Sequence, residues 1–243
     1  MKNLDPDLLL RAYAIGVFPM SDSRDARDVY WVEPRRRAII PLDGFHLSKS
    51  LRKTLRSDRF EVTLDRAFGE VVRRCAARED TWINDTIEHS YNLLNSSGHA
   101  HSVEVWLEGQ LVGGLYGVRL GAAFFGESMF SSRTDASKVA LAWLVARLIV
   151  GGFTLLDCQF MTEHLRRLGA VEIEQKAYLA LLASALGGGS AGAAAGGSGA
   201  AGAGGVSGAA PVEFAALDRL LADRPTGSPP SGWVISQLLG QTS

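Results

Sequence analysis

The sequence has few cysteines and no long hydrophobic segment. Two cysteines in 243 residues, Cys75 and Cys158, do not make the disulfide framework of a secreted domain. The longest apolar helical run, from Val139 to Val150, contains Arg147 and is too short to cross a bilayer. The N-terminal segment lacks the basic region and the apolar core of a signal peptide. These absences predict a cytoplasmic protein without a membrane partner.

Motifs for common cofactors and nucleophiles are also missing. The sequence contains neither a P-loop nor a dinucleotide-binding fingerprint. His99 and His101 lack a third and fourth ligand at the spacing of a metal site, so we predict no metal. Ser128 does not lie in a nucleophile-elbow motif, and Cys158 has no activating partner in the sequence.

Composition divides the chain into unequal parts. Residues 24–78 hold 14 Lys and Arg against 8 Asp and Glu, although the net charge of the chain is −1. Such a segment indicates an anionic partner or, equally, a solvated charged surface. Residues 187–210 hold 11 Gly, 9 Ala and 3 Ser, which predicts a flexible, exposed and dispensable insertion. We therefore predict a basic N-terminal subdomain over 1–59, a larger domain over 60–186, the insertion, and a C-terminal extension of the larger domain over 211–243.

Hydrophobic periodicity and capping residues predict alternating helices and strands. Asp5 and Pro6 begin a helix that ends at Gly16, and Ser48 caps a basic helix that ends at Arg56. The predicted helices cover 4–16, 46–56, 66–77, 86–96, 136–150, 162–168, 176–186 and 212–222. The predicted strands cover 29–32, 38–41, 60–64, 103–107, 111–119, 122–128 and 153–159. This order predicts an α+β layered sheet in which the apolar last strand is buried on both faces.

Two polar residues stand out in that apolar strand. Asp157 and Gln159 are two positions apart, so a regular strand directs both side chains to one face and Cys158 to the other. A carboxylate beside an amide can bind and orient an amine. The alternative is that both side chains only satisfy neighbouring backbone groups, as buried polar residues usually do.

A second polar candidate, Glu127, lies among aromatic residues in FFGES (124–128). Aromatic rings beside a glycine suit a pocket for an apolar side chain, whereas a core strand whose glutamate pairs with an arginine is the alternative. Phe124 and Glu127 are an odd number of residues apart, so both can reach one ligand only if a bulge or a strand end intervenes. Trp106 and Tyr116 are core aromatics or platforms for a nucleobase.

These residues occur within a series of motifs that resembles one protein family. The motifs are GVFP (16–19), Ala67-Phe68 within 65–69, TWI (81–83), GHAHSVEVW (98–106), LVGGLYGV (111–118), GESMFS (126–131), ASKVAL (136–141), DCQ (157–159) and LGAVEI (168–173). In this order they resemble the leucyl/phenylalanyl-tRNA–protein transferases from about residue 4 to 186. The Gly/Ala-rich insertion is not part of the usual pattern.

The resemblance implies a fold, a reaction and a set of partners. It implies that an acetyltransferase-like (GNAT-type) catalytic domain, with a mixed sheet flanked by helices, follows the N-terminal subdomain. Such an aminoacyltransferase moves Leu or Phe from Leu-tRNA or Phe-tRNA to the α-amino group of proteins that begin with Arg or Lys, which creates an N-degron. It needs no metal or small cofactor, and we expect a monomer.

The resemblance also assigns roles to residues. Asp157 and Gln159 match the catalytic pair that orients the attacking amine, and Glu127 matches an acid that contacts an amino group. The remaining matches are Phe124, Met129 and Phe130 for the side-chain pocket, Trp106 and Tyr116 for the terminal adenosine, and Arg52 and Lys53 for the tRNA. Many relatives carry Trp after GVFP, where this chain has Met20, which is large and apolar enough to fill that place.

Three rival functions differ in what they require. A coenzyme A-dependent acetyltransferase needs a Gly-rich turn between strand and helix, and residues 131–136 contain no glycine. A non-catalytic RNA-binding module would suit the basic segment but leaves Asp157, Gln159 and Glu127 without a purpose. A transferase that modifies N-terminal Asp or Glu shares the reaction type, and the matched motifs argue against it.

Overall fold

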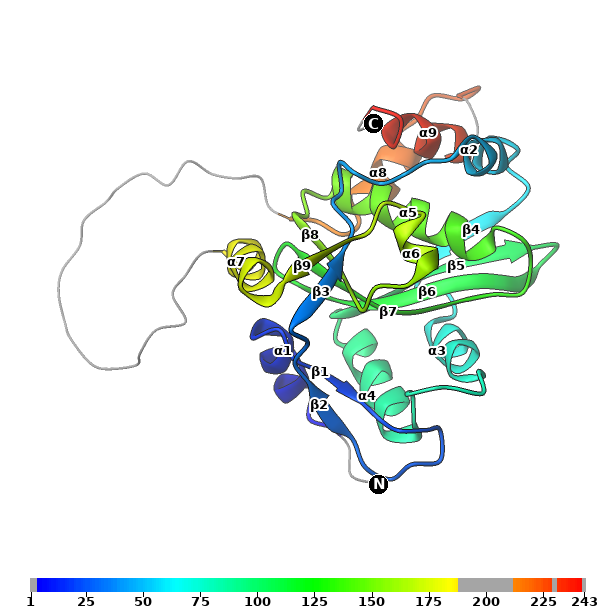
Figure 1. Cartoon of the computed structure of the whole chain (residues 1–243). Coiled ribbons are helices and arrows are strands. Elements are labelled where there is room, and N and C mark those ends of the chain that lie inside the picture. Colours follow the sequence, from blue (N-terminus) through cyan, green and yellow to red (C-terminus); the bar gives the residue numbers. More distant parts are fainter. Residues whose placement is uncertain (1–3, 188–211, 229–230, 242–243) are drawn as a thin grey trace, which may run out of the picture.

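A seven-stranded mixed sheet forms the centre of the computed structural model, which describes residues 4–187, 212–228 and 231–241. The strands run β4-β5-β6-β7-β8-β3-β9 across the sheet, and β1 and β2 form a separate pair (Figure 1). The strands are β1 (Phe18–Met20), β2 (Tyr30–Val32), β3 (Arg36–Ile39), β4 (Glu61–Leu64), β5 (Ala100–Leu107), β6 (Gln110–Leu120), β7 (Ala123–Ser131), β8 (Leu155–Gln159) and β9 (Val171–Glu174). Only β7 and β8 pair in parallel; the other described pairs are antiparallel.

Helices cover both faces of this sheet. They are α1 (Pro6–Ala14), α2 (Lys49–Arg56), α3 (Phe68–Ala76), α4 (Asp85–Ser96), α5 (Ala136–Val150), α6 (Glu163–Arg166), α7 (Gln175–Ala185), α8 (Ala216–Ala222) and α9 (Ser231–Leu238). One face carries α5 with α2, α8 and α9, and the other carries α1, α3 and α4 (Figure 1). The α+β class and the mixed sheet flanked by helices are therefore confirmed. Among the described residues, no helix combines the length and the apolarity of a membrane span.

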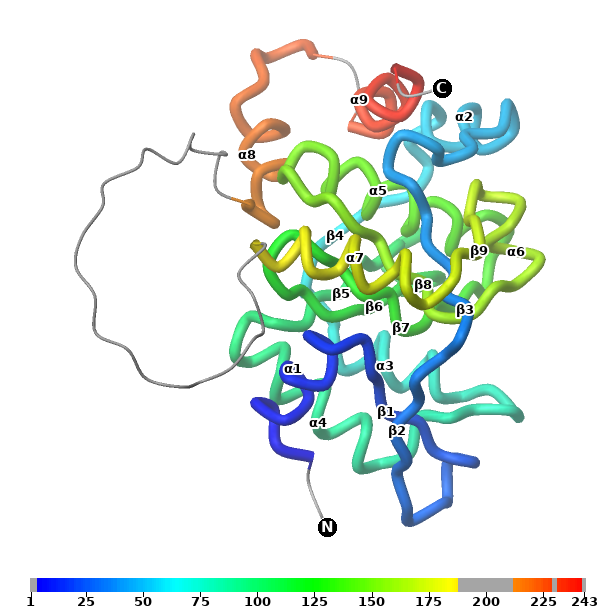
Figure 2. The backbone as a smooth tube through the Cα atoms, turned by 60° about the vertical axis from the view of Figure 1, so that its left-hand side comes forward, coloured from blue at the N-terminus to red at the C-terminus, as the bar shows by residue number. Residues whose placement is uncertain are grey.

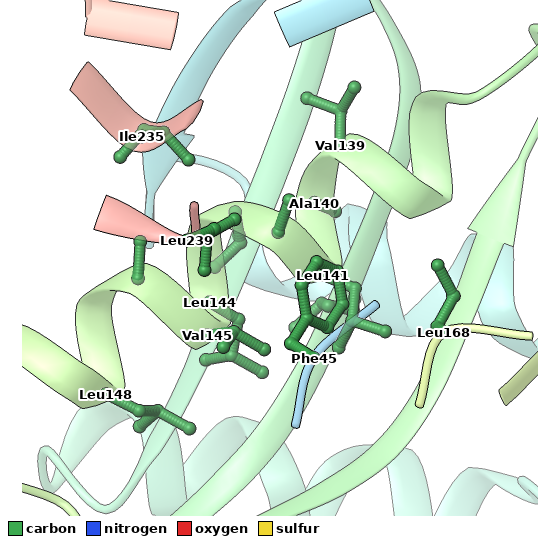
Figure 3. Close-up of a cluster of buried hydrophobic side chains, with 14 of the residues drawn as sticks. Phe45, Val139, Ala140, Leu141, Leu144, Val145, Leu148, Leu168, Ile235 and Leu239 are labelled. Carbon is green, nitrogen blue, oxygen red and sulfur yellow. The ribbon is translucent and has the colours of Figure 1, made fainter. Parts of the chain in front are cut away.

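The long helix α5 is the centre of one hydrophobic core. Most of its side chains are buried because the helix is apolar on nearly all sides and is covered by other helices as well as by the sheet. Figure 3 shows side chains of α5 meeting Phe45, Leu168, Ile235 and Leu239, which come from distant parts of the chain. The structure gives this helix the predicted bounds, 136–150.

The capping residues predicted for two other helices are present in the structure. The side chain of Asp5 accepts a hydrogen bond from the backbone N of Asp7, and Ser48 accepts one from Leu51, so both predicted caps are confirmed. Two short strands had no prediction. In β1 the central residue is Pro19, which does not indicate a strand, and β9 (VEIE) is a short edge strand with a charged surface.

The N-terminal part of the chain is divided between the main sheet and its two faces. It passes from β1 and β2, through β3 inside the main sheet, to α2 on the α5 face (Figure 2). An N-terminal subdomain over 1–59 stays a prediction, and β3 shows that part of this range completes the large sheet. Apart from Gly187, the predicted insertion over 187–210 lies outside the described residues.

Candidate active site

A β-bulge directs Glu127 to one face of the sheet. Tyr116 pairs with Ser128 and Gly117 pairs with Gly126, so Glu127 is an extra residue on β7. The bulge that the spacing of Phe124 and Glu127 required is therefore present. It does not bring the two side chains together, because Phe124 stays in the core on the α5 face.

The carboxyl group of Glu127 is buried and accepts three hydrogen bonds from side chains. Oε1 accepts hydrogen bonds from the hydroxyl of Tyr13 at 2.6 Å and from Nε2 of Gln159 at 2.9 Å. Oε2 accepts one from the hydroxyl of Tyr91 at 2.9 Å. Burial raises the pKa of Glu127 to about 7, although the three hydrogen bonds act in the opposite direction. Glu127 is thus a carboxyl group that changes charge near neutral pH.

This raised pKa makes stability depend on pH. Between pH 4.5 and about pH 7 the folded protein keeps a proton on Glu127 that the unfolded chain has lost, so stability falls as pH rises through this window. The shift corresponds to about 3 kcal/mol. Urea unfolding at pH 4.5 and pH 8 measures this effect in the wild-type protein and in Glu127→Gln. We expect the free energy of unfolding of the wild-type protein, relative to that of Glu127→Gln, to be about 3 kcal/mol higher at pH 4.5 than at pH 8. Parallel pH profiles would contradict a buried, titrating Glu127.

Asp157 is buried in an ion pair with Arg37, and its side chain has no exposure to solvent. Arg37 donates from Nε at 3.0 Å and from Nη2 at 2.7 Å, and Tyr178 donates its hydroxyl at 2.8 Å. The rings of Phe18 and Tyr178 lie 4.7 and 4.5 Å from the guanidinium carbon, and the pKa of Arg37 is raised by Asp157 even though burial lowers it. Because Arg37 compensates its charge, Asp157 is poorly suited to stabilise a cationic substrate directly.

The third hydrogen-bonding partner of Asp157 is the backbone of Gln159. Its N–H donates to Oδ1 of Asp157 at 2.8 Å. Gln159 has a φ of 63°, the left-handed conformation that side-chain-bearing residues rarely adopt. Asp157 therefore stabilises an unfavourable turn that ends β8 and brings the amide of Gln159 to Glu127.

Gln159 and Glu127 lie in the wall of a cavity of about 400 Å³ between β7, β8, α5 and α6. Apolar side chains form much of the wall: Leu115, Met129, Leu141, Leu144, Leu156 and Leu165. Tyr116 also lines it, and its buried hydroxyl has no hydrogen-bond partner among the described residues. Cys158 lines the apolar part, where burial raises the pKa of its thiol and keeps it protonated. The cavity thus joins an apolar chamber to a polar end.

Several predicted site residues lie elsewhere. Trp106 is on β5, where its Nε1 donates to Thr63 at 2.8 Å and Arg66 stacks on its ring. Met20 pairs with Tyr30 outside the cavity. The remaining placements are Met129 in the cavity wall, Phe130 in a neighbouring surface depression, Phe124 in the core, and Arg52 and Lys53 on α2.

Four residues that hold the two acids of the site had no role in the sequence analysis. Tyr13 and Tyr91, which hold Glu127, resemble ordinary buried positions of amphipathic helices. Arg37 and Tyr178, which hold Asp157, are 120 and 21 residues away from it. The only available signal was indirect: an acid in an apolar strand needs a partner. Within the described residues no group of His, Cys, Asp and Glu is arranged to hold a metal ion.

An apolar chamber with a carboxyl group and an amide in its wall suits a small ligand with an apolar body and a polar head. Comparisons with known proteins specify the class further. The model of the family "Leucyl/phenylalanyl-tRNA protein transferase" matches residues 39–183, and that of its N-terminal domain matches residues 2–35. The chain belongs to this family of aminoacyltransferases, which confirms the resemblance and the enzyme class.

Curated relatives of the chain carry the name of the same family. A leucyl/phenylalanyl-tRNA–protein transferase of Rhizorhabdus wittichii is 65% identical over 250 aligned residues, which cover 100% of both chains. Those of Zymomonas mobilis and Paramagnetospirillum magneticum are 61% and 60% identical, covering 75% and 76% of this chain and 70% and 91% of theirs. The crystal structure of FemX is similar at 14% identity and a TM-score of 0.45, covering 69% of this chain and 66% of that chain.

Proposed function

We propose that the protein transfers Leu or Phe from charged tRNA to the α-amino group of proteins that begin with Arg or Lys. The observation that carries the proposal is the cavity of about 400 Å³, apolar along Leu141, Leu144 and Leu156 and polar at Glu127 and Gln159. The apolar side chain of Leu or Phe suits such a chamber, and the donor's amino group suits its carboxyl end. The reaction takes place in the cytoplasm, and its products are N-degron substrates.

The reaction requires positioning more than activation. The α-amine of the acceptor attacks the ester carbonyl, the new C–N bond forms, and the C–O bond to the terminal ribose breaks. An α-amine has a pKa of about 7.7–8.0, so a fair fraction is neutral at cellular pH. Gln159 is a very weak base, so its role is to orient the amine, while the proton passes to the ribose oxygen that leaves.

The polar residues in and beside the cavity have separate roles in the proposed reaction. Glu127, with a pKa of about 7, accepts hydrogen bonds from an amino group in the cavity. The unpartnered hydroxyl of Tyr116 supplies a further hydrogen bond to the bound donor. Asp157 is a positioning residue, because it acts through the backbone of Gln159. Holding the ester and the amine in contact accounts for rate enhancement without a covalent intermediate.

A transfer assay tests the donor and the acceptor separately. Leu-tRNA, Phe-tRNA and Lys-tRNA with labelled amino acids are each incubated with peptides that begin with Arg, Lys or Asp. We expect label from Leu-tRNA and Phe-tRNA on the Arg and Lys peptides, and at least about 100-fold less from Lys-tRNA, because an ammonium group is costly in an apolar chamber. Label on the Asp peptide would overturn the acceptor assignment, and no transfer at all would overturn the proposed function.

A further inference from the structure

Arg78 lies where the cavity meets a second, outer depression. The depression has a volume of about 670 Å³, and its lining includes Glu70, Arg74, Arg78, Met129 and His164. Three of these residues, Arg78, Met129 and His164, also line the inner cavity. The depression is therefore the vestibule of the cavity, and Arg78 stands at the passage between them.

The guanidinium of Arg78 is anchored beside the site but keeps donors free. Its Nη2 donates to the hydroxyl of Ser128 and, at 2.8 Å, to the carbonyl oxygen of Met129, the two residues that follow Glu127 on β7. Its Nε and Nη1 donate to no oxygen or nitrogen atom in the described part of the chain, although the thiol of Cys75 lies beside the guanidinium, and the side chain is exposed. A fixed guanidinium with two unused donor groups can donate a charge-assisted hydrogen bond to an anion.

The charge of Arg78 is also uncompensated. Among the described residues no carboxylate lies within ion-pair distance of it, whereas Arg73 and Arg74 on α3 both bind Glu70, at 2.8 and 2.9 Å. Glu70 is the only acid among the described residues of the vestibule lining, and these two ion pairs compensate its charge. Burial, together with Lys138 and Arg167, lowers the pKa of His164, so this residue is neutral at pH 7. The vestibule is consequently positive around Arg78.

The positive charge of Arg78 acts differently on the two substrates of the proposed reaction. An acceptor protein presents an α-ammonium group and, in the proposed function, a basic first side chain, so Arg78 repels it. The donor presents anions: in an aminoacyl-tRNA the amino acid is esterified to the terminal ribose, and the nearest anion is the phosphodiester on the other side of that same nucleoside. When the amino acid occupies the inner cavity, this group lies one nucleoside away from it, and Arg78 is the arginine that lines both the cavity and the vestibule.

We propose that Arg78 binds the phosphodiester that joins the last two nucleotides of the donor tRNA. The inference rests on the proposed function, since it requires the donor amino acid to occupy the inner cavity. It assigns the vestibule to the 3′ strand of the tRNA. The acceptor then reaches the ester from another side, away from Arg78.

Binding of unreactive donor analogues tests this assignment without relying on transfer. In both analogues an amide replaces the ester of a phenylalanyl-adenosine; one of them also carries a 5′-linked cytidylate and so contains the phosphodiester. For the wild-type protein we expect the second analogue to bind about 10-fold to 100-fold more tightly, the range for one charged hydrogen-bonded contact. Arg78→Gln removes this preference and leaves the first analogue within about 2-fold of the wild-type affinity.

Two further variants complete the design. Arg78→Lys retains the charge and part of the preference, because an ammonium group still attracts the phosphate but lacks the anchored donor geometry of the guanidinium. Arg73→Gln changes a cation of the same region that lines neither cavity, and it keeps the full preference. An equal loss of affinity for both analogues in Arg78→Gln, or an unchanged preference, overturns the proposal. Failure of the proposed function is seen separately, in the peptide transfer assay.

Discussion

Asp157→Ala is expected to lower the free energy of unfolding by about 3–5 kcal/mol and to abolish measurable transfer. The side chains of Asp157 and Arg37 are 0% and 1% exposed, so the substitution leaves a buried guanidinium without its counter-ion. The turn at Gln159 also loses the acceptor of its backbone N–H. Urea unfolding measures the first effect, and transfer of Leu to an Arg-initiated peptide measures the second.

A double variant separates stability from positioning. Arg37→Met combined with Asp157→Leu removes both buried charges, so most of the lost stability is expected to return. Transfer stays low, because leucine offers no acceptor to the N–H of Gln159. The exposed pair Arg66–Glu61 provides the control: Arg66→Met costs less than about 1 kcal/mol. Normal transfer by the double variant would contradict the positioning role of Asp157.

Phe214→Ala is the second substitution with a large expected effect, about 3–5 kcal/mol of unfolding free energy. Phe214 is 3% exposed, stacks on Phe124 with ring centres 5.5 Å apart and on His101 at 4.3 Å, and contacts Phe153 edge-on at 5.8 Å. Its carbonyl oxygen accepts a hydrogen bond from Arg147, at 2.9 Å. Deletion of the ring therefore opens a cavity among groups that other contacts hold in place.

The matched control for this substitution lies in the same part of the chain. Trp233 is larger than Phe214 but 38% exposed, so Trp233→Ala is expected to cost less than Phe214→Ala in the same urea titration. Equal effects would contradict a core position for Phe214. The comparison bears on the C-terminal extension as a whole, which follows the family match at residues 39–183 and still supplies Phe214, Leu217 and Ile235 to the core.

The sequence was most informative where structure depends on neighbouring residues. The helix over 136–150 and the caps at Asp5 and Ser48 involve contacts within a few positions, so periodicity and side-chain type predicted them. The motifs from GVFP to LGAVEI identified the family, because their order and spacing are properties of the sequence itself. The short strands β1 and β9 are formed by pairing with partners elsewhere, and no local signal marked them.

The sequence predicted the residue types that form the site better than it predicted where those residues lie. Glu127 and Gln159 were candidates because polar side chains in apolar strands are costly, and the structure brings them together at 2.9 Å. Tyr116 and Met129 also line the cavity, whereas Trp106, Met20 and Phe124 do not. An aromatic residue on a strand satisfies the same pattern in a core as in a binding site, so the sequence could not distinguish these positions.

The sequence alone determined the family, the α+β class and the residue types that carry the chemistry. The tertiary structure decided which of those residues meet. The bulge that turns Glu127 toward Tyr13 and Tyr91 depends on the register between β6 and β7, and the pair of Arg37 with Asp157 depends on β3 lying beside β8. Strand register is fixed by the burial of the whole sheet, which is a property of the folded chain and not of any single segment.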